Sequence, residues 1–411
     1  MRFIYKILTQ LSWFVLQGIA SFRPKIGRFV KGRKQSFSLL EGGLSPKGRT
    51  LWMHVASLGE YEQGLPILEG LRGNYPDHQI LLTFFSPSGY EVKKDAPLAD
   101  LVAYLPMDTL ANSRKFLDLV RPELALFIKY EIWPNYLREL QKRKIPTLLA
   151  SARFSGRQIY FRSYGGFMRK SLEAFTHFFV QDRDSVELLE GLGHRNVTLG
   201  GDSRFDRVMK IAKADNRLDF MDSFKGACFT LVAGSSWAED EQLLIPYING
   251  CGDGIKFVIA PHEIKEEHIA KIEQSLEKSS LRYSQREDRA LEGVQVLILD
   301  TIGLLNKVYS YADVAYVGGG FATGLHNTLE PAVHGIPVII GPRYQGFREA
   351  VDLVRLGGLL PVGDQGEFTS VLDRLREGPA HRERLGRINQ NYINAHTGAT
   401  RRILEYIGQV L

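Results

Sequence analysis

The chain has 411 residues, of which 44% are hydrophobic and 24% are charged. This composition excludes a fibrous or disordered chain, and the length leaves room for two domains of about 150 to 200 residues each. With only two cysteines, Cys228 and Cys251, a disulfide framework is excluded and a reducing compartment is favoured. One stretch, residues 23–34, holds six basic residues and no acid. Its excess of positive charge equals the net charge of the whole chain, +6. A nucleic-acid binder spreads basic residues over a larger face, so we predict no nucleic-acid partner.

A hydrophobic segment, residues 3–22, stands directly before this basic stretch. Its apolar residues recur at helical spacing but are interrupted by polar ones, which leaves open a spanning helix or an amphipathic helix in the membrane interface. A helix packed on its own domain is the structural alternative. In either membrane arrangement the basic stretch faces an anionic cytoplasmic leaflet. We therefore predict that residues 1–34 form a membrane anchor.

From residue 50 onward, short β-rich runs alternate with helical windows, as in a doubly wound sheet. The predicted strands are TLWMHVA, HQILLTFF, LVAYLP, ELALFI, PTLLAS, HFFVQ and NVTLGG. The predicted helices cover residues 60–72, about 112–120, 133–142 and a long region over 157–173. The polar stretch AKADNRLDFMDSFKGA then interrupts this rhythm, so we place a domain boundary after residue 212.

The same alternation restarts in the second half of the chain. Its predicted strands are CFTLVAGSS, GIKFVIAP, GVQVLILD, DVAYVGGG and GIPVIIGP. The sequence thus predicts two Rossmann-like α/β domains, residues 35–212 and 213–395, followed by a helix over 396–411 that packs toward the first domain. Ligands of such sheets bind at the carboxyl ends of the strands, so we expect the site in a central cleft that both domains face. This arrangement is typical of a GT-B nucleotide-sugar transferase rather than a dehydrogenase.

A glycine-rich loop, VGGGFATGLHNTLEP, follows one strand of the second domain. It has no Walker lysine and lacks the spacing of a nicotinamide-binding fingerprint. A strand, then glycines, then a helix start can hold a phosphate, and a turn without a ligand is the alternative. In the first reading Gly319 and Gly320 admit the phosphate, Asn327 begins the helix, and Glu330 accepts hydrogen bonds from ribose hydroxyls.

Other polar residues of the second domain also follow predicted strands. Ser235 and Ser236 precede a helix whose amides could hold an anion, His262 follows the next strand, and the loop supplies His326. No cysteine and histidine cluster has zinc spacing. The D-x-D at residues 182–184 begins a helical window, where capping competes with metal binding. We therefore predict catalysis without a metal and without a cofactor.

In the first domain, three strand ends carry candidate chemistry. Glu60 is placed to act as a general base for an attacking hydroxyl, although Ser57 and Glu60 also have the spacing of a capping box. Glu131, in KYEIWPN, either binds a sugar hydroxyl or caps the helix that follows. Arg204, in GDSRFD, either pairs with a phosphate or carboxylate or is a surface arginine.

In this order, the motifs resemble those of the 3-deoxy-D-manno-octulosonic acid (Kdo) transferases of lipid A synthesis. The resemblance runs through HVASLGE, EIWPN, SARFS, GDSRFD, ADVAYVGGG and GLHNTLEPAVHGIPVIIGP. It implies a metal-independent, inverting GT-B glycosyltransferase of lipopolysaccharide biosynthesis. Such an enzyme moves Kdo from CMP-Kdo to the tetraacylated lipid A precursor at the cytoplasmic face of the bacterial inner membrane.

The resemblance also implies roles for individual residues. Glu60 falls on the family's catalytic base, and Asn327 and Glu330 fall in its CMP-binding motif. On the same nucleotide side it places Ser235, Ser236 and His262. Two positions depart from the family pattern: Arg204 stands where lysine is usual, and Lys129 stands where many members have an acid, which leaves the acceptor contacts near Lys129 open.

Two other functions remain as alternatives at the level of sequence. One is another nucleotide-sugar enzyme on the same scaffold, such as an epimerase, which would need no lipid acceptor. The other is a non-catalytic protein that binds the membrane surface through its N-terminal segment.

Overall fold

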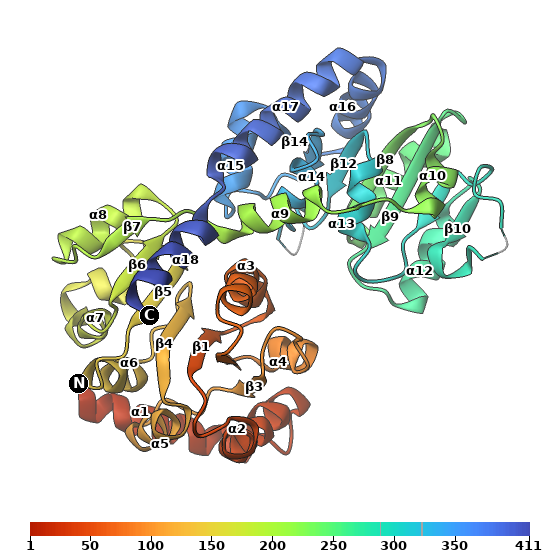
Figure 1. Cartoon of the computed structure of the whole chain (residues 1–411). Coiled ribbons are helices and arrows are strands. Elements are labelled where there is room, and N and C mark those ends of the chain that lie inside the picture. The colour runs from red at the N-terminus through yellow and green to blue at the C-terminus, as the bar shows by residue number, and fades with distance from the viewer. Residues whose placement is uncertain (288, 322–323) are drawn as a thin grey trace. The chain divides into compact units, whose positions relative to one another are not determined.

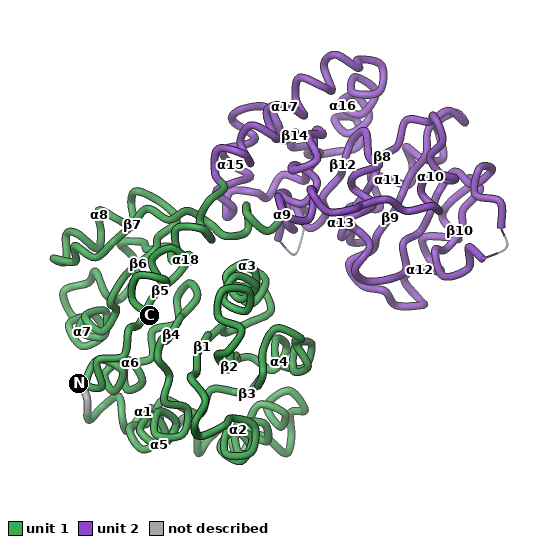
Figure 2. The backbone as a smooth tube through the Cα atoms, in the orientation of Figure 1, with its two compact units in different colours: residues 1–207, 397–411 green, residues 208–396 purple. Residues whose placement is uncertain are grey.

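A computed structural model of the chain describes residues 1–287, 289–321 and 324–411, so Ala322 and Thr323 of the glycine-rich loop lie outside the described residues. The chain divides into two compact units (Figure 2). Unit 1 comprises residues 1–207 and 397–411, and unit 2 comprises residues 208–396. Each unit is built on one seven-stranded sheet with helices around it (Figure 1). The two Rossmann-like α/β domains predicted from the sequence are confirmed.

The sheet of unit 1 is parallel, with strand order β3-β2-β1-β4-β5-β6-β7. Its strands are β1 Thr50–Val55, β2 Gln79–Phe84, β3 Leu101–Tyr104, β4 Pro122–Ile128, β5 Thr147–Ala152, β6 His177–Val180 and β7 Val197–Leu199. The chain builds outward from β1 to one edge and then returns to the other side at β4. The β1–β4 pair is therefore the switch point of this sheet, where an open α/β sheet leaves a crevice beyond its strand ends.

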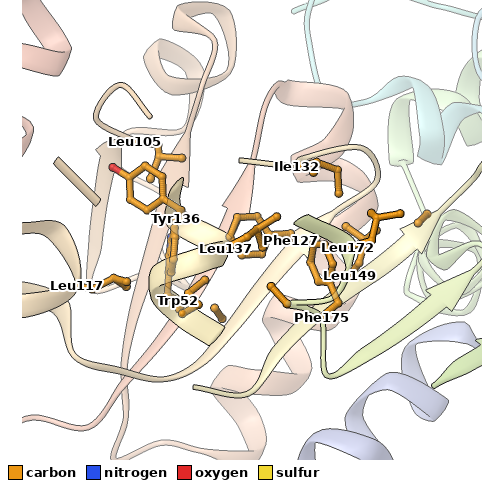
Figure 3. Packing of buried hydrophobic residues seen from close by; sticks show 14 of the residues in the cluster. Trp52, Leu105, Leu117, Phe127, Ile132, Tyr136, Leu137, Leu149, Leu172 and Phe175 are labelled. Atoms are coloured by element: carbon orange, nitrogen blue, oxygen red, sulfur yellow. The ribbon is translucent and has the colours of Figure 1, made fainter. Parts of the chain in front are cut away.

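The hydrophobic side chains of unit 1 form a core on each face of this sheet. Along β1, Trp52 enters one cluster, which Figure 3 shows with Phe127 and Phe175. Its neighbours Leu51 and Met53 enter the cluster on the other face. This alternation follows from the two-residue period of a strand, and it explains why a strand buried on both faces has a continuous apolar sequence. The sheet is therefore a rigid base for the residues that follow its strands.

Helices of unit 1 come from both ends of the chain. They are α1 Arg2–Ile19, α2 Pro24–Gly43, α3 Leu58–Asn74, α4 Pro87–Lys93, α5 Leu110–Val120, α6 Pro134–Lys142, α7 Gly166–Leu172, α8 Arg183–Gly191 and α18 Ala399–Val410, while α9 Ser203–Lys213 leads into unit 2. The C-terminal α18 returns to unit 1, where Ile403 and Ile407 join the core beside α3. The amides of Gly398 and Thr400 donate to the Asp206 carboxylate at 2.5 and 2.7 Å, which fixes the start of this helix.

The N-terminal helix α1 exposes most of its apolar side chains. Phe3 and Phe14 are 73% and 74% exposed. The other large exposed residues of the stripe are Ile4, Ile7, Leu8, Leu11, Val15 and Ile19. Within the described residues, no helix combines the length and the apolar character needed to cross a membrane. The apolar stripe of α1 is therefore not covered by its own domain.

The basic stretch 23–34 falls within and just before α2, and one of its members is not a surface charge. Arg33 is 3% exposed, and its guanidinium lies 3.5 Å from the ring centroid of Phe29 and 4.6 Å from that of Phe85. Burial lowers the pKa of Arg33 to about 9. Cation–π contacts and a hydrogen bond to the Phe85 carbonyl offset part of the cost of burying this charge. The other five basic residues of the stretch are exposed.

The long helical region predicted over 157–173 is confirmed only in part, because no continuous helix forms there. That region forms two 3₁₀ turns, Ile159–Phe161 and Ser163–Gly165, before the short α7. Gly165 packs so tightly that a Cβ on it would lie 1.7 Å from the Ile159 carbonyl oxygen. The Arg169 side chain satisfies carbonyls of these turns, so tertiary contacts override the helical propensity of the region.

Unit 2 repeats this architecture with strand order β10-β11-β9-β8-β12-β13-β14. Its strands are β8 Phe229–Ser236, β9 Ile255–Pro261, β10 Ser280–Arg282, β11 Val296–Ile298, β12 Val314–Val317, β13 Val338–Ile340 and β14 Leu359–Pro361. Its helices are α10 Asp219–Lys225, α11 Ala238–Gly250, α12 Glu266–Ser275, α13 Leu305–Val308, α14 Leu329–Ala332, α15 Arg348–Leu356, α16 Gln365–Glu377 and α17 Pro379–His396. The switch point lies between β8 and β12. The sequence missed β10 and β14, since three-residue edge strands carry too little pattern.

Candidate active site

The switch point of unit 1 brings two carboxylates and a lysine to the same edge of the sheet. Glu60 lies in the first turn of α3, just after β1, and Lys129 and Glu131 follow β4. Because β1 and β4 pair in parallel, the residues after both strands share one edge. The candidates Glu60, Lys129 and Glu131 are therefore brought together by the fold.

Glu60 is a buried carboxylate whose proton affinity is raised. It is 8% exposed, and its side chain accepts a hydrogen bond from the Ala56 amide in the turn that joins β1 to α3. Burial, and then the negative charge of Glu131, raise the pKa of Glu60 to about 7, although the Ala56 amide and Lys129 act in the opposite direction. A carboxyl group with a pKa near the working pH can both take up and release a proton.

The predicted capping box at this turn forms only in part. Glu60 accepts from the amides of Ala56 and Ser57, but Ser57, the N-cap of α3, makes no side-chain cap hydrogen bond. The backbone contacts hold the carboxylate in place. Its raised pKa is not a feature that a solvent-exposed cap needs.

Glu131 belongs to a buried polar network and does not cap α6. Its Oε2 lies 3.0 Å from Nε2 of His54 and accepts from Nε1 of Trp133 at 2.9 Å. On the other side of the ring, His54 Nδ1 lies 2.8 Å from the Thr83 hydroxyl. The carboxylate is thus held in one orientation by two rings, so its charge acts on Glu60 from a fixed position.

Lys129 occupies a position that the backbone holds in an uncommon conformation. Its φ of 64° is in the left-handed region, and its amide donates to the Ala150 carbonyl at 2.9 Å. The positive charge lowers the pKa of Glu60, so Lys129 stabilises the ionised base. A strained residue beside a buried carboxylate is typical of a functional site.

Arg204 is already paired within unit 1. It begins α9, and its Nε and one terminal nitrogen donate to the same Asp202 oxygen at 2.9 and 2.7 Å. The other oxygen of Asp202 accepts from Gln63 at 2.8 Å. Asp202 therefore fixes the direction of the guanidinium, and a ligand phosphate would share this cation with it.

In unit 2, the strand ends near the switch point carry a stack of three rings. Trp237 follows β8, His262 follows β9, and His326 comes from the loop after β12. The centroid of the His262 ring lies 4.5 Å from that of Trp237 and 4.4 Å from that of His326. Trp237 Nε1 donates to His326 Nε2 at 3.0 Å. Burial and the neighbouring His262 lower the pKa of His326 to about 4, so this ring is neutral at physiological pH.

The glycine-rich loop satisfies several of its own amides. Gly318 donates to the Gly234 carbonyl, and Gly319 donates to the Asp240 carboxylate at 2.9 Å. A Cβ on Gly320 would lie 2.7 Å from the backbone of Gly341. Gly319, with a φ of 89°, and Gly320 are therefore needed for backbone conformation and close packing. This structure gives them a role that does not depend on a phosphate.

The remaining candidate residues of unit 2 differ in burial and in their hydrogen bonds. The hydroxyl of Ser236 is buried and donates to Glu241 at 2.9 Å, whereas Ser235 is half-buried with a φ of 53°. Asn327 donates to Glu330 at 3.0 Å and accepts from the Leu329 amide. Asn327 and Glu330 thus form one hydrogen-bonded pair at the start of α14, whose N-cap is Thr328 and not the predicted Asn327.

The D-x-D motif also has a settled structural role. Asp182 is the N-cap of α8 and accepts from the Ser185 amide at 2.9 Å, so the capping alternative is confirmed. Sequence reasoning missed three residues: His54, Trp237 and Asp240. The last accepts from Tyr316 and from Gly319, and it anchors the glycine-rich loop. Trp237 and Asp240 stand inside the AGSSWAEDE motif, where an aromatic residue after a strand end was the available signal.

Two Rossmann-like units, each built on one parallel sheet, form a fold of the GT-B type. A fold of this kind is seen in the crystal structure of UDP-GlcNAc 2-epimerase from Neisseria meningitidis bound to UDP-GlcNAc, with a TM-score of 0.61 and 14% identity over 88% of this chain and all of that one. At that identity the likeness concerns the fold alone.

The family is indicated by sequence. A family model described as 3-deoxy-D-manno-octulosonic-acid transferase (kdotransferase) matches residues 25–207. The 3-deoxy-D-manno-octulosonic acid transferase of Haemophilus influenzae is 27% identical over 99% of this chain and 98% of its own length. That of Aquifex aeolicus is 29% identical over 79% of this chain and 85% of its own length. These matches support a 3-deoxy-D-manno-octulosonic acid transferase and indicate that the chain is a glycosyltransferase.

Proposed function

We propose that the protein transfers Kdo from CMP-Kdo to a hydroxyl of the tetraacylated lipid A precursor, with inversion and without a metal, in lipopolysaccharide biosynthesis. The observation that carries this proposal is the buried Glu60 at the switch point of unit 1, with its pKa raised to about 7 by burial and by Glu131. A sugar hydroxyl is a weak nucleophile, so its attack needs a base that removes the proton as the new bond forms.

In the proposed step, Glu60 takes the proton of the acceptor hydroxyl while that oxygen bonds to the anomeric C2 of Kdo. The bond between C2 and the phosphate oxygen breaks with its electron pair, and CMP leaves. Lys129 holds Glu60 in its ionised form before the step, and Glu131 raises its proton affinity so that the proton is retained afterwards. Arg204, oriented by Asp202, is the cation proposed to balance the charge that grows on the departing phosphate.

We propose that the donor, CMP-Kdo, binds at the carboxyl ends of the strands of unit 2. The stack of Trp237, His262 and His326 offers a flat aromatic surface to the nucleotide. Glu330, positioned by Asn327, accepts from the ribose hydroxyls. Ser235 and the glycine-rich loop are the proposed neighbours of the phosphate, with Gly319 and Gly320 shaping the loop rather than donating to the ligand.

The proposal also gives the N-terminal region a role at the cytoplasmic face of the bacterial inner membrane. The exposed apolar stripe of α1 has the character of a helix that lies in the interface. The exposed basic residues of the 23–34 stretch then face anionic head groups. Such an arrangement would bring unit 1 to an acceptor that is itself an amphiphile with two phosphates.

The decisive experiment is a transfer assay with CMP-Kdo and tetraacylated lipid A precursor, without added metal, followed by mass spectrometry. Product from the wild type and none from Glu60→Gln would support both the reaction and the base, and the product mass would count the Kdo residues added. If Glu60→Gln turned over at a near-normal rate, the assignment of the base would be wrong. The fold is shared with an epimerase, so the same assay should also follow CMP-Kdo without acceptor: conversion there would favour an epimerase-type reaction.

A further inference from the structure

Unit 1 contains a cavity that the proposed reaction does not use. It has a volume of about 520 Å³ and is enclosed by α1, α5, α6 and α7. This size lies within the range of roughly 300–1,000 Å³ that small-molecule sites occupy. Neither Glu60 nor Glu131 is among its lining residues, so it is separate from the switch point.

The lining combines an apolar wall with a one-sided charge. Phe3, Tyr5, Leu110 and Phe167 supply large apolar surfaces. The charged side chains at the cavity are Lys6, Arg114, Arg138 and Lys170. Among the described residues that line it, none is acidic. Arg114 also pairs with Glu139 at 3.4 Å, behind the lining, so the surplus of positive charge lies mainly with the three other residues.

One wall of the cavity is the helix that exposes its apolar stripe. Tyr5 holds α1 against the domain, because its hydroxyl donates to the buried Asp108 at 2.7 Å and its ring lies 5.3 Å from that of Phe167. On the same helix, Ile4 and Leu8 are 52% and 55% exposed. The cavity and the exposed stripe therefore share α1, and an apolar chain could pass from one to the other with little contact with water.

We propose that this cavity binds one acyl chain of an anionic phospholipid of the surrounding bilayer, whose phosphate is held by Lys6, Arg138 and Lys170. The apolar wall removes the chain from water, and the three cations neutralise the head group. Such a lipid fixes α1 on unit 1. It is distinct from the general attraction of the basic 23–34 stretch to a charged surface, because it needs a formed cavity and one lipid per chain.

A bilayer phospholipid fits better than the sugar acceptor for two reasons. The cavity contains none of the residues proposed to activate the acceptor, and its wall is the helix whose exposed stripe would lie among the bilayer chains. The inference does not depend on which sugar is transferred, and it is tested by lipid binding rather than by turnover.

The test is native mass spectrometry of the full chain in detergent with added phosphatidylglycerol or phosphatidylcholine. The wild type should carry one phosphatidylglycerol and bind it better than phosphatidylcholine. Ala111→Trp, on the exposed first turn of α5 at the cavity, should fill the space and weaken both adducts about tenfold or more. The matched control Ala111→Ser should bind like the wild type.

A second pair of variants tests the charges without touching the core. Arg138→Glu/Lys170→Glu should lose the preference for phosphatidylglycerol, whereas Lys94→Glu/Lys142→Glu, two exposed lysines outside the cavity lining, should keep it. Equal binding of both lipids by the wild type, or an unchanged adduct in Ala111→Trp with a normal melting curve, would overturn the proposal. It would also be overturned if tetraacylated lipid A precursor displaced phosphatidylglycerol one for one, because the cavity would then belong to the acceptor site.

Discussion

The switch-point edges of the two units differ in the kind of side chain that they hold. In unit 1 the edge is charged: Glu60 is buried beside the negative charge of Glu131, and its pKa is raised to about 7. In unit 2 the edge is a stack of aromatic rings, in which the pKa of His326 is lowered to about 4. The same fold thus places at one edge a carboxyl group that can exchange a proton near neutral pH, and at the other a ring, His326, that stays neutral there.

The largest effect that we expect is on catalysis at the edge of unit 1. Glu60→Gln should lower kcat by about 10²- to 10⁴-fold, since an amide cannot take up the proton of the acceptor. CMP binding, measured by calorimetry, should stay within about twofold, because the nucleotide contacts are assigned to unit 2. If CMP affinity fell together with kcat, the proposal that unit 1 supplies the base and unit 2 binds the nucleotide would be contradicted.

The same substitution, although it lowers kcat, should raise the free energy of unfolding at neutral and alkaline pH. The folded-state pKa of Glu60 is about 7 and its ordinary value is 4.5, so the folded state holds this proton more tightly than the unfolded state. The stability of the wild type therefore falls as pH rises from about 4.5 to 7. Above pH 7 Glu60→Gln should be more stable by about 1–3 kcal/mol, and below pH 4.5 the gain should vanish.

Chemical denaturation at pH 8 and at pH 4 would measure this difference. A purely structural cap predicts little change, because the amide oxygen of glutamine can also accept from the backbone amides in a capping box. A gain in stability at pH 8 therefore separates a carboxylate kept for function from one kept for the helix.

A smaller effect is expected at the edge of unit 2. His326→Ala removes one end ring of the stack and the acceptor of the Trp237 hydrogen bond, and CMP affinity should fall about tenfold, in line with roughly 0.5–1.5 kcal/mol for a ring pair beyond its buried area. Calorimetry with CMP measures this, and His381→Ala, on α17 outside the stack, is the matched control. An unchanged affinity would remove the stack from the nucleotide site.

The smallest effect should come from the carboxylate behind the base. Glu131→Gln removes the negative charge that raises the pKa of Glu60, so the rising limb of kcat/KM against pH should move to lower pH by a fraction of a unit. Its amide can still accept from Trp133, which preserves the network. A limb that stays in place would show that burial alone sets the proton affinity of Glu60.

Sequence patterns were sufficient to predict the helices and strands that have strong hydrophobic periodicity. The fully buried β1 was predicted from its apolar run, and the helix after it from its cap residues. The helix predicted over 157–173 is interrupted, and sequence patterns did not predict the interruption. It depends on the contact of Gly165 with Ile159 and on carbonyls that accept from Arg169, and helix propensity does not describe such tertiary contacts.

The sequence by itself determined two parallel α/β domains and placed Glu60, Glu131 and His262 after strands, because local periodicity specifies strands, helices and their ends. Only the tertiary structure decided the chemistry of those residues. The proton affinity of Glu60 depends on burial and on Glu131, and the neutrality of His326 depends on burial and on His262. These partners are distant in sequence, and electrostatic effects depend on separation in space and on desolvation, which the order of residues does not encode.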